Sequence, residues 1–159
     1  MANQLKTVED IVTEYYEKIY KYCYWQIKDE FKAQDITHEI FLCFIEQCNK
    51  NVKINNINAY IYTIARNKCI DTLKDKKKFW LELADLEDIN TNSLFDTVLN
   101  RITLEKAMEH LKDDEKEIMI LKYSQCLTIK EIARIMNMTS FNVQYKVKIS
   151  LKKLKKILG

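Results

Sequence analysis

Residues 127–158 read LTIKEIARIMNMTSFNVQYKVKISLKKLKKIL, and this stretch has the pattern of a helix-turn-helix. Thr128 and Glu131 have the T-x-x-E spacing of a capping box, which predicts the start of a short helix. Asn137 stands at the turn, where Asn tolerates the left-handed backbone that Gly usually supplies. Thr139 can cap a second helix, so the stretch predicts two short helices that meet at a corner.

The second helix of this stretch has one apolar face and one polar, basic face. Val143, Val147 and Leu154 recur at helical spacing, with either Ser150 or Leu151 between them, which predicts the buried face.

The opposite face carries side chains that suit the major groove of DNA. Gln144 has the amide that pairs with adenine, Phe141 suits a thymine methyl group, and the lysines suit phosphates. An ordinary helical hairpin without any contact to DNA is the alternative interpretation of the same pattern. The predicted DNA-contacting residues of this segment are Thr128, Lys130, Ser140, Phe141, Asn142, Gln144, Tyr145, Lys146 and Lys148.

The composition of the whole chain excludes several other kinds of site. The chain has 159 residues, no Pro, and a single Gly at its last position. Phosphate-binding loops and dinucleotide fingerprints need Gly where the backbone approaches a phosphate, so neither fits this sequence. Tight β-hairpins also depend on Gly, and we therefore predict an all-α fold.

Helical periodicity divides the chain into two small domains. Amphipathic helices are expected over residues 8–28, 33–48 and about 58–77, which together form a first domain at 1–78. Residues 79–92 are acidic and polar and predict a flexible linker. Residues 93–159 form the second domain: a helix from Ser93, a helix from Asp113 with Ile118, Leu121 and Tyr123 inward, and the helix-turn-helix.

The charge is distributed unevenly along the chain. The net charge of +3 combines an excess of two basic residues over 1–78, an excess of four acidic residues over 79–103, and an excess of five basic residues over 104–159. Two basic domains separated by an acidic connector favour two contacts with one long polyanion.

Motifs for other chemistry and for export are absent from the sequence. The N-terminus has no apolar signal segment, and no run is long enough to span a membrane. The five cysteines are scattered and form no metal-ligand pattern with the two histidines. We expect a cytoplasmic protein with buried, reduced thiols, no bound metal and no cofactor.

Taken together, the two halves resemble a bacterial RNA polymerase sigma factor of the extracytoplasmic-function (ECF) type. FKAQDITHEIFLCFIEQ (31–47) resembles the polymerase-binding segment of that family, and AYIYTIARNKCIDTLKDKKK (59–78) resembles its promoter-melting segment. LEKAMEHLKDDEKEIMILKYSQCLTIKEIARIMNMTSFNVQYKV (104–147) resembles the reader of the upstream, −35 promoter element. The match covers nearly the whole chain, with the segments in the family's order.

The resemblance implies a transcription initiation factor that is not itself an enzyme. It would bind core RNA polymerase through the clamp helices of the largest subunit and through the flap region, recognise the −35 and −10 elements, and assist melting. Its partners would be core polymerase, promoter DNA and an anti-sigma factor, without membrane insertion of its own. Asp35, His38 and Glu39 would face the clamp helices.

The same resemblance implies which residues meet the −10 element. In the family an unstacked base of the non-template strand is captured in a pocket, and Asn67 has an amide that can read a base edge. The residues implied for contact with the −10 region are Arg66, Asn67, Lys68, Asp71, Lys74, Lys76, Lys77 and Lys78.

The upstream reader departs from the family pattern at several positions. Lys112 replaces a usual Pro, Phe141-Asn142-Val143 replaces Gly-Thr-Val, and Ile149-Ser150 replaces Arg-Ala. Because lysine replaces most of the expected arginines, bidentate reading of guanine is lost, and we expect a preference for A·T base pairs.

Three other functions compete with this interpretation. A stand-alone helix-turn-helix regulator would bind palindromic DNA as a dimer without polymerase. A small recombinase would need a catalytic site in residues 1–78, which hold one Arg and no Ser. A helical adaptor that does not bind DNA is disfavoured by the lysine-rich C-terminal end.

Overall fold

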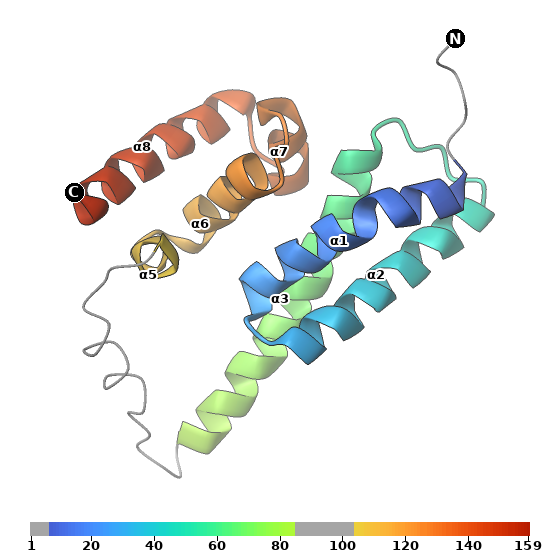
Figure 1. Cartoon of the computed structure of the whole chain (residues 1–159), viewed down its shortest axis with the longest axis horizontal. Helices are drawn as coiled ribbons and strands as arrows, with labels where there is room; N and C mark the ends of the chain where they lie inside the picture. The colour runs from blue at the N-terminus through green and yellow to red at the C-terminus, as the bar shows by residue number, and fades with distance from the viewer. Residues whose placement is uncertain (1–6, 85–103) are drawn as a thin grey trace.

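The computed structural model describes residues 7–84 and 104–159, which form helices and no strand within these two ranges (Figure 1). The first domain consists of α1 (Val8–Ile27), α2 (Glu30–Asn49) and α3 (Ile57–Ala84). The second domain consists of α5 (Leu104–Glu109), α6 (Asp113–Met119), the π-helical turn η1 (Ile120–Ser124), α7 (Ile129–Met136) and α8 (Ser140–Leu158). The prediction of an all-α fold with a C-terminal helix-turn-helix is confirmed.

Side chains from all three helices build the core of the first domain. α1 begins at Thr7, whose hydroxyl accepts a hydrogen bond from the Asp10 amide at 3.2 Å, while the Asp10 carboxylate accepts one from the Thr7 amide. This capping box sets where the helix starts, and the apolar spacing then sets which face is buried. The fully buried large side chains of this domain are Ile19, Tyr22, Ile27, Ile40, Phe44, Ile61 and Tyr62.

α3 is longer than the sequence analysis predicted. The helix was expected to end near Lys77, before a linker from Phe79, but it continues to Ala84. Neither Pro nor Gly is available to stop it, and residues 79–84 can all continue a helix. The rest of the predicted linker, and the start of the helix predicted from Ser93, lie outside the described residues.

The helix-turn-helix has the local structure that the sequence predicts. Thr128 and Glu131 form a reciprocal capping box, with both hydrogen bonds at 3.1 Å. Asn137 takes the left-handed conformation, with φ 54° and ψ 50°, and Thr139 caps α8 by accepting from the Asn142 amide. Of the two candidates for the buried face of α8, Ser150 is buried and Leu151 is exposed.

The π-helical turn η1 explains one wrong prediction. Tyr123 was expected to point inward, but 53% of its surface is exposed. A π-helical turn holds more residues than an α-helical turn, so the residues after Met119 rotate out of the 3.6-residue register. Gln125, directly after this turn, is buried instead and points toward the first domain.

The cysteines are only partly placed as expected. All five are free; Cys23 and Cys69 are buried, Cys43 and Cys48 are half-buried, and Cys126 is exposed, contrary to the prediction of buried thiols. In the described ranges, no helix is long and apolar enough to cross a membrane, and no group of three potential metal ligands comes together.

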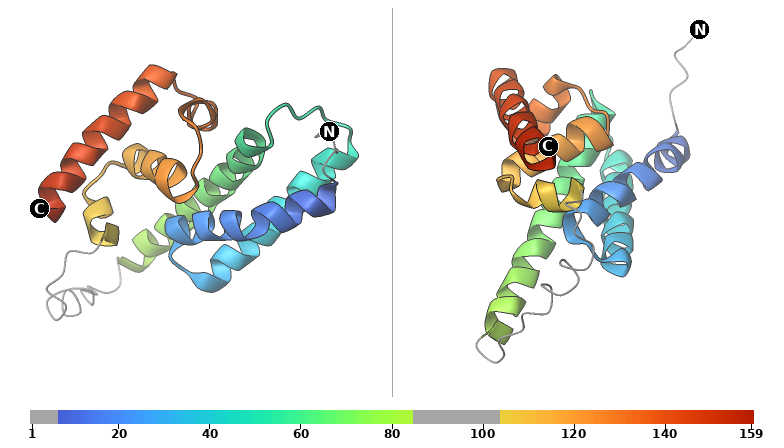
Figure 2. Two further views of the ribbon diagram at one scale, coloured as in Figure 1. Left: turned by 45° about the horizontal axis from the view of Figure 1, so that its top comes forward. Right: turned by 60° about the vertical axis from the view of Figure 1, so that its left-hand side comes forward.

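The two domains pack against each other, an arrangement for which the sequence holds no pattern. α7 lies against the N-terminal part of α3, and η1 lies against α1, so the second domain contacts two helices of the first (Figure 2). Among the described residues, Glu117, Gln125 and Glu131 accept side-chain contacts from the first domain, and Glu105 forms an ion pair with Lys28 at 3.4 Å.

We predict that the turn of the helix-turn-helix tolerates Gly but not a β-branched residue. Asn137→Val places a β-branched side chain at positive φ and should lower the free energy of unfolding by about 1–2 kcal/mol, whereas Asn137→Gly should leave it nearly unchanged. Urea unfolding followed by circular dichroism measures both variants. A Val variant as stable as the wild type would contradict the left-handed assignment.

Candidate nucleic-acid interface

The exposed residues of α8 between Ser140 and Lys148, here called the front of α8, present a polar and aromatic surface to solvent. Phe141 is 76% exposed and Tyr145 is 56% exposed, so two large rings are available for contact with a partner. Other predicted DNA-contacting residues that are exposed on α8 or at the start of α7 are Thr128, Lys130, Ser140, Asn142, Gln144 and Lys148. The structure thus brings eight of the nine predicted residues to the surface of the helix-turn-helix.

Lys146 is the exception among the predicted DNA contacts. Its ammonium group binds the carboxylate of Asp114 on α6, and the side chain is half-buried. The hydrogen bond from Lys146 holds the pKa of Asp114 below its ordinary value. Lys153 makes a similar ion pair with Glu115 at 2.9 Å, so both lysines fasten α8 to α6. This placement does not support a phosphate contact for Lys146, whereas Lys148 is free for one.

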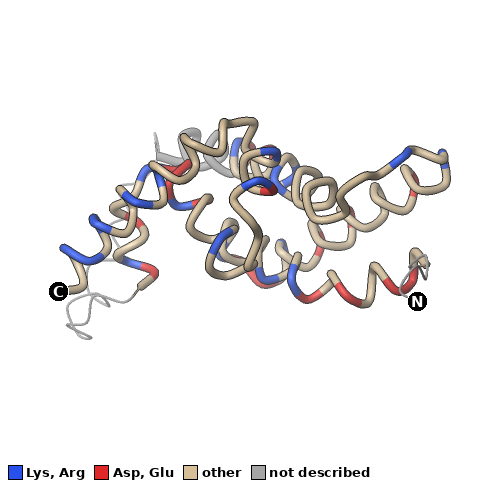
Figure 3. The backbone as a smooth tube through the Cα atoms, turned by 90° about the horizontal axis from the view of Figure 1, so that it is seen from above, with Lys and Arg blue, Asp and Glu red and all other residues tan. Residues whose placement is uncertain are grey.

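Basic residues continue along α8 toward the C-terminus of the chain (Figure 3). Lys152, Lys155 and Lys156 are exposed there. The lysine-rich end is therefore a solvated surface of positive charge beside the front of the helix, as phosphate contacts require.

A stripe of polar residues runs along one face of α3. Asn67, Asp71 and Lys74 are exposed at spacings of four and three residues, so they share this face, and Lys68 beside them is half-buried. Lys76, Lys77 and Lys78 lie on the described backbone of α3, but their side chains lie outside what the structure describes.

Arg66 lies on a different face of α3, turned toward the second domain. Its Nε lies 2.9 Å from Oε1 of Glu117 on α6. The hydroxyl of Tyr22 on α1 donates to the same oxygen at 2.7 Å, and burial together with Glu117 raises the pKa of Tyr22 well above its ordinary value. Glu117 therefore bridges two helices of the first domain, and the predicted DNA contact of Arg66 is occupied within the chain.

Two further hydrogen bonds extend this contact between the domains. The Tyr62 hydroxyl on α3 donates to Gln125 at 2.6 Å, and the Asn58 amide donates to Glu131 at 2.7 Å. Burial raises the pKa of Glu131, but hydrogen bonds from Thr128 and Asn58 outweigh it, so the net pKa is lowered.

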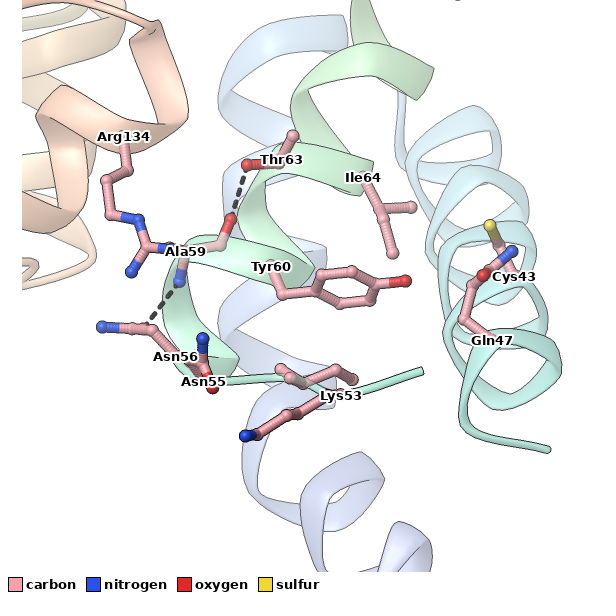
Figure 4. Close-up of a pocket in the computed structure, with 11 residues that line it drawn as sticks. Cys43, Gln47, Lys53, Asn55, Asn56, Ala59, Tyr60, Thr63, Ile64 and Arg134 are labelled. Carbon is pink, nitrogen blue, oxygen red and sulfur yellow. Dashed lines mark hydrogen bonds between the residues drawn. The ribbon is translucent and has the colours of Figure 1, made fainter. Parts of the chain in front are cut away.

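A pocket opens at the N-terminal end of α3 (Figure 4). Its volume is about 420 Å³, and it lies between α2, the 50–56 segment and α3. Asn56 caps α3 by accepting from the Ala59 amide at 2.9 Å, which leaves the Asn55 side chain and the Tyr60 ring to line the cavity. Arg134 reaches the same pocket from α7 of the second domain.

The pocket and the polar stripe belong to one continuous face of α3. Tyr60, Ile64 and Asn67 follow one another at spacings of four and three residues, so the pocket leads directly to Asn67. The sequence analysis found Asn67 but missed Asn55 and Tyr60, because nothing in the local pattern shows that the 50–56 segment folds beside α3.

The exposed face of α2 holds the residues predicted to meet polymerase. Asp35, His38 and Glu39 are all exposed, and the His38 Nε2 lies 2.8 Å from the hydroxyl of Tyr16. Phe31 and Leu42 flank them on the same face and are 77% and 67% exposed. The sequence analysis missed these two apolar residues, although their helical spacing places them opposite the buried face of α2.

Models of two protein-family regions match the chain in sequence order. Residues 11–79 match sigma-70 region 2, and residues 101–154 match sigma-70 region 4. The chain belongs to the sigma-70 family. The region 2 match covers most of α1, all of α2 and α3 as far as residue 79, and the region 4 match covers the helix-turn-helix. The candidate surfaces on α2, α3 and α8 therefore all lie within sigma-70 regions.

Relatives of this sigma factor include proteins described as ECF sigma factors. The chain is 29% identical over 167 residues to SigW of Bacillus subtilis, an alignment that covers 94% of this chain and 87% of SigW. It is 28% identical over 131 residues to BldN of Streptomyces coelicolor, which covers 77% of this chain but only 49% of BldN.

Solved structures of sigma factors share the fold. RpoE in complex with the anti-sigma factor NepR from Bartonella quintana matches with a TM-score of 0.74 at 15% identity, over 97% of this chain and 98% of RpoE. CnrH in complex with the cytosolic domain of CnrY matches with a TM-score of 0.72 at 14% identity, over 99% of this chain and 90% of CnrH. Both matches extend over the two domains.

The different surroundings of two neighbouring lysines on α8 predict different effects on DNA binding. Lys148→Ala should weaken binding to duplex DNA and reduce the slope of log affinity against log salt by about one phosphate contact. Lys146→Ala, whose lysine is already paired with Asp114, should leave that slope unchanged. Fluorescence anisotropy with a labelled duplex at several salt concentrations measures both. Equal slopes for the wild type and Lys148→Ala would remove Lys148 from the interface.

Proposed function

We infer that the chain is a transcription initiation factor that binds core RNA polymerase and directs it to specific promoters. The observation that carries this function is the presence of sigma-70 region 2 and region 4 in order on one chain. A stand-alone dimeric regulator is not favoured, because such a regulator has no use for a polymerase-binding and promoter-melting domain.

Polymerase docks on the exposed face of α2 in this proposal. Phe31 and Leu42 supply apolar contact area at either end of the face, and Asp35, His38 and Glu39 supply polar contacts between them. An apolar patch with polar groups within it is typical of a protein–protein interface. The family resemblance implies that the partner surface is the clamp helices of the largest polymerase subunit.

The −10 element is recognised by the face of α3 that contains the pocket. The Tyr60 ring offers a surface on which an unstacked base can stack, and Asn55 offers amide groups for its edge. Asn67 and Lys74 continue the contact along the strand. An extruded base loses about a few kcal/mol of stacking energy, and binding in the pocket offsets this loss. Melting therefore requires no catalytic group in this chain.

The −35 element is recognised by the front of α8. Gln144 and Phe141 contact base edges in the major groove, and Lys130 and Lys148 contact the phosphates. Because the basic residues here are mainly lysines, which bind phosphate as point charges, most of the affinity is independent of sequence. Since core polymerase and promoter DNA are cytoplasmic, the factor acts in the cytoplasm.

An anti-sigma factor is the expected inhibitory partner, as in the two solved complexes of similar fold. An apolar groove of about 340 Å³ lies between Trp25 of α1 and the second domain, where Met119, Tyr123 and Leu151 line it. The groove spans both domains, so we propose that an apolar segment of the anti-sigma factor binds there and holds the two domains together.

Run-off transcription tests the proposed function directly. Purified chain and core polymerase are incubated with a library of genomic fragments, and transcripts are sequenced to locate their start sites. We expect a set of starts that appears only when the chain is added and shares two upstream elements. If the chain directs no initiation, the proposed function is wrong.

Two variants separate the polymerase surface from the melting surface. Leu42→Asp should weaken binding to core polymerase about tenfold or more, because it introduces a charge into an apolar contact. Asn67→Ala should leave polymerase binding unchanged and reduce open-complex formation, as measured by permanganate reactivity of the unpaired thymines. Leu158→Asp, which alters another exposed leucine at the C-terminal end, is the control. Equal loss of both activities in Asn67→Ala would contradict its role.

A further inference from the structure

Two cysteines face each other in the core of region 2. Cys23 comes from α1 and Cys69 from α3, and both are free thiols with buried side chains. The thiol of Cys69 donates a hydrogen bond to the sulfur of Cys23, where α1 packs against α3. The pair therefore brings together two groups that a single covalent bond can join.

Contacts that do not involve the cysteines hold the same parts of α1 and α3 together. Tyr22, the residue before the first cysteine, donates to Oε1 of Glu117 at 2.7 Å, and Arg66, one helical turn before the second, lies 2.9 Å from the same oxygen. The rings of Tyr22 and Tyr62 also meet edge to face, with their centroids 5.7 Å apart. The juxtaposition of the two thiols is thus built into the packing of region 2.

The two thiols have different acidities. The hydrogen bond from Cys69 holds the pKa of Cys23 below its ordinary value; burial opposes this effect, and a hydrogen bond from Thr37 adds to it. The pKa of Cys69 is raised, because this thiol keeps the proton that it shares with Cys23 and because it is buried. One sulfur therefore has thiolate character while its neighbour holds the proton, a division of roles that favours thiol oxidation and exchange.

A cleft leads from solvent to the pair. Cys69 lines a cleft of about 590 Å³ between α3 and α6. Gln26 of α1 lines the same cleft, and its buried Nε2 has no hydrogen-bond partner among the described residues. This N–H group can donate to an oxygen of a small polar molecule that enters the cleft, such as a peroxide. A small oxidant therefore has a polar route to the two sulfur atoms.

We propose that Cys23 and Cys69 are a modification site, at which hydrogen peroxide converts the two thiols into a disulfide that joins α1 to α3. The peroxide oxidises one thiol to a sulfenic acid, and its second oxygen leaves as water. The other thiol then attacks the sulfenic sulfur, the S–S bond forms, and a second water leaves. The two thiols supply the two electrons that reduce one peroxide, so no further reactant is needed.

The disulfide would act on the stability of region 2 and not on its binding surfaces. It would close a loop of 46 residues, which restricts the unfolded chain and so favours the folded one. Both sulfur atoms lie in the core, whereas Asp35 of α2 and Asn67 of α3 are exposed on other faces of these helices. Disulfides in the cytoplasm are usually transient, so the bond would stabilise region 2 during exposure to peroxide and be reduced afterwards.

Peptide mapping of the full-length chain tests the site. The folded chain is treated with hydrogen peroxide, the remaining thiols are alkylated after unfolding, and a tryptic digest is analysed by mass spectrometry without reduction. Cleavage after lysine leaves the two cysteines in separate peptides, residues 22–28 and 69–74. We expect these peptides to appear as one linked species, which dithiothreitol separates.

Variants and thermal unfolding supply the controls. Cys43→Ser and Cys126→Ser should keep the linked species, whereas Cys69→Ala should abolish it. The midpoint of thermal unfolding, followed by circular dichroism, should be about 5 °C or more higher in the oxidised wild type than in the reduced one. Cys69→Ala treated in the same way should show no such increase. Should Cys69→Ala not fold, the wild type with and without dithiothreitol gives the same comparison.

Three results would overturn the proposal. Alkylation of both Cys23 and Cys69 in a sample whose exposed Cys126 has been oxidised would show that peroxide does not join the pair. A linked species that forms only in urea would show that the folded core does not permit the bond. An unchanged midpoint in chains that carry the linked peptides would contradict the stabilising effect. None of these measurements uses polymerase or DNA, so their outcome is independent of run-off transcription.

Discussion

The Glu117 carboxylate on α6 accepts a hydrogen bond from the buried Tyr22 hydroxyl and forms an ion pair with Arg66, so one oxygen links the second domain to two helices of the first. Tyr22 is fully buried, so its hydroxyl requires a partner, and the Glu117 oxygen supplies it. The adjacent Tyr62 meets the same requirement through Gln125. These contacts place the acidic start of α6 opposite residues of α3 that are predicted to contact DNA.

The two predicted DNA-binding surfaces have different surroundings in the structure. The front of α8 is fastened from behind by the Lys146–Asp114 and Lys153–Glu115 ion pairs, which orient the helix without using its exposed face. The face of α3 predicted to contact the −10 element lies beside α6 and α7, which contribute side chains to its pockets.

Much of the local structure could be predicted from the sequence, because local side-chain chemistry determines it. The Thr128 capping box and the left-handed Asn137 are properties of a few adjacent residues, and both are present as predicted. Tyr123 was predicted wrongly because a π-helical turn changes the register, which periodicity alone does not reveal. The end of α3 was misplaced because acidic composition was taken as evidence against a helix.

The candidate sites were only partly predictable for a different reason. Asn67 and Gln144 belong to recognisable motifs, whereas Asn55 and Tyr60 form a pocket only after the 50–56 segment folds beside α3. Glu117 and Arg66 are 51 positions apart in the sequence, and no periodic pattern connects them. Contacts of this kind depend on the relative placement of whole domains, which a single sequence does not encode in any local signal.

The distance between the domains in the free chain tests the account most directly. Fluorescent labels introduced through unnatural amino acids at the exposed positions Glu17 on α1 and Lys155 on α8 report this distance by energy transfer. The account predicts one short distance, because side-chain contacts of Glu117, Gln125 and Glu131 join the two domains. A long distance, or a broad distribution of distances, would contradict it.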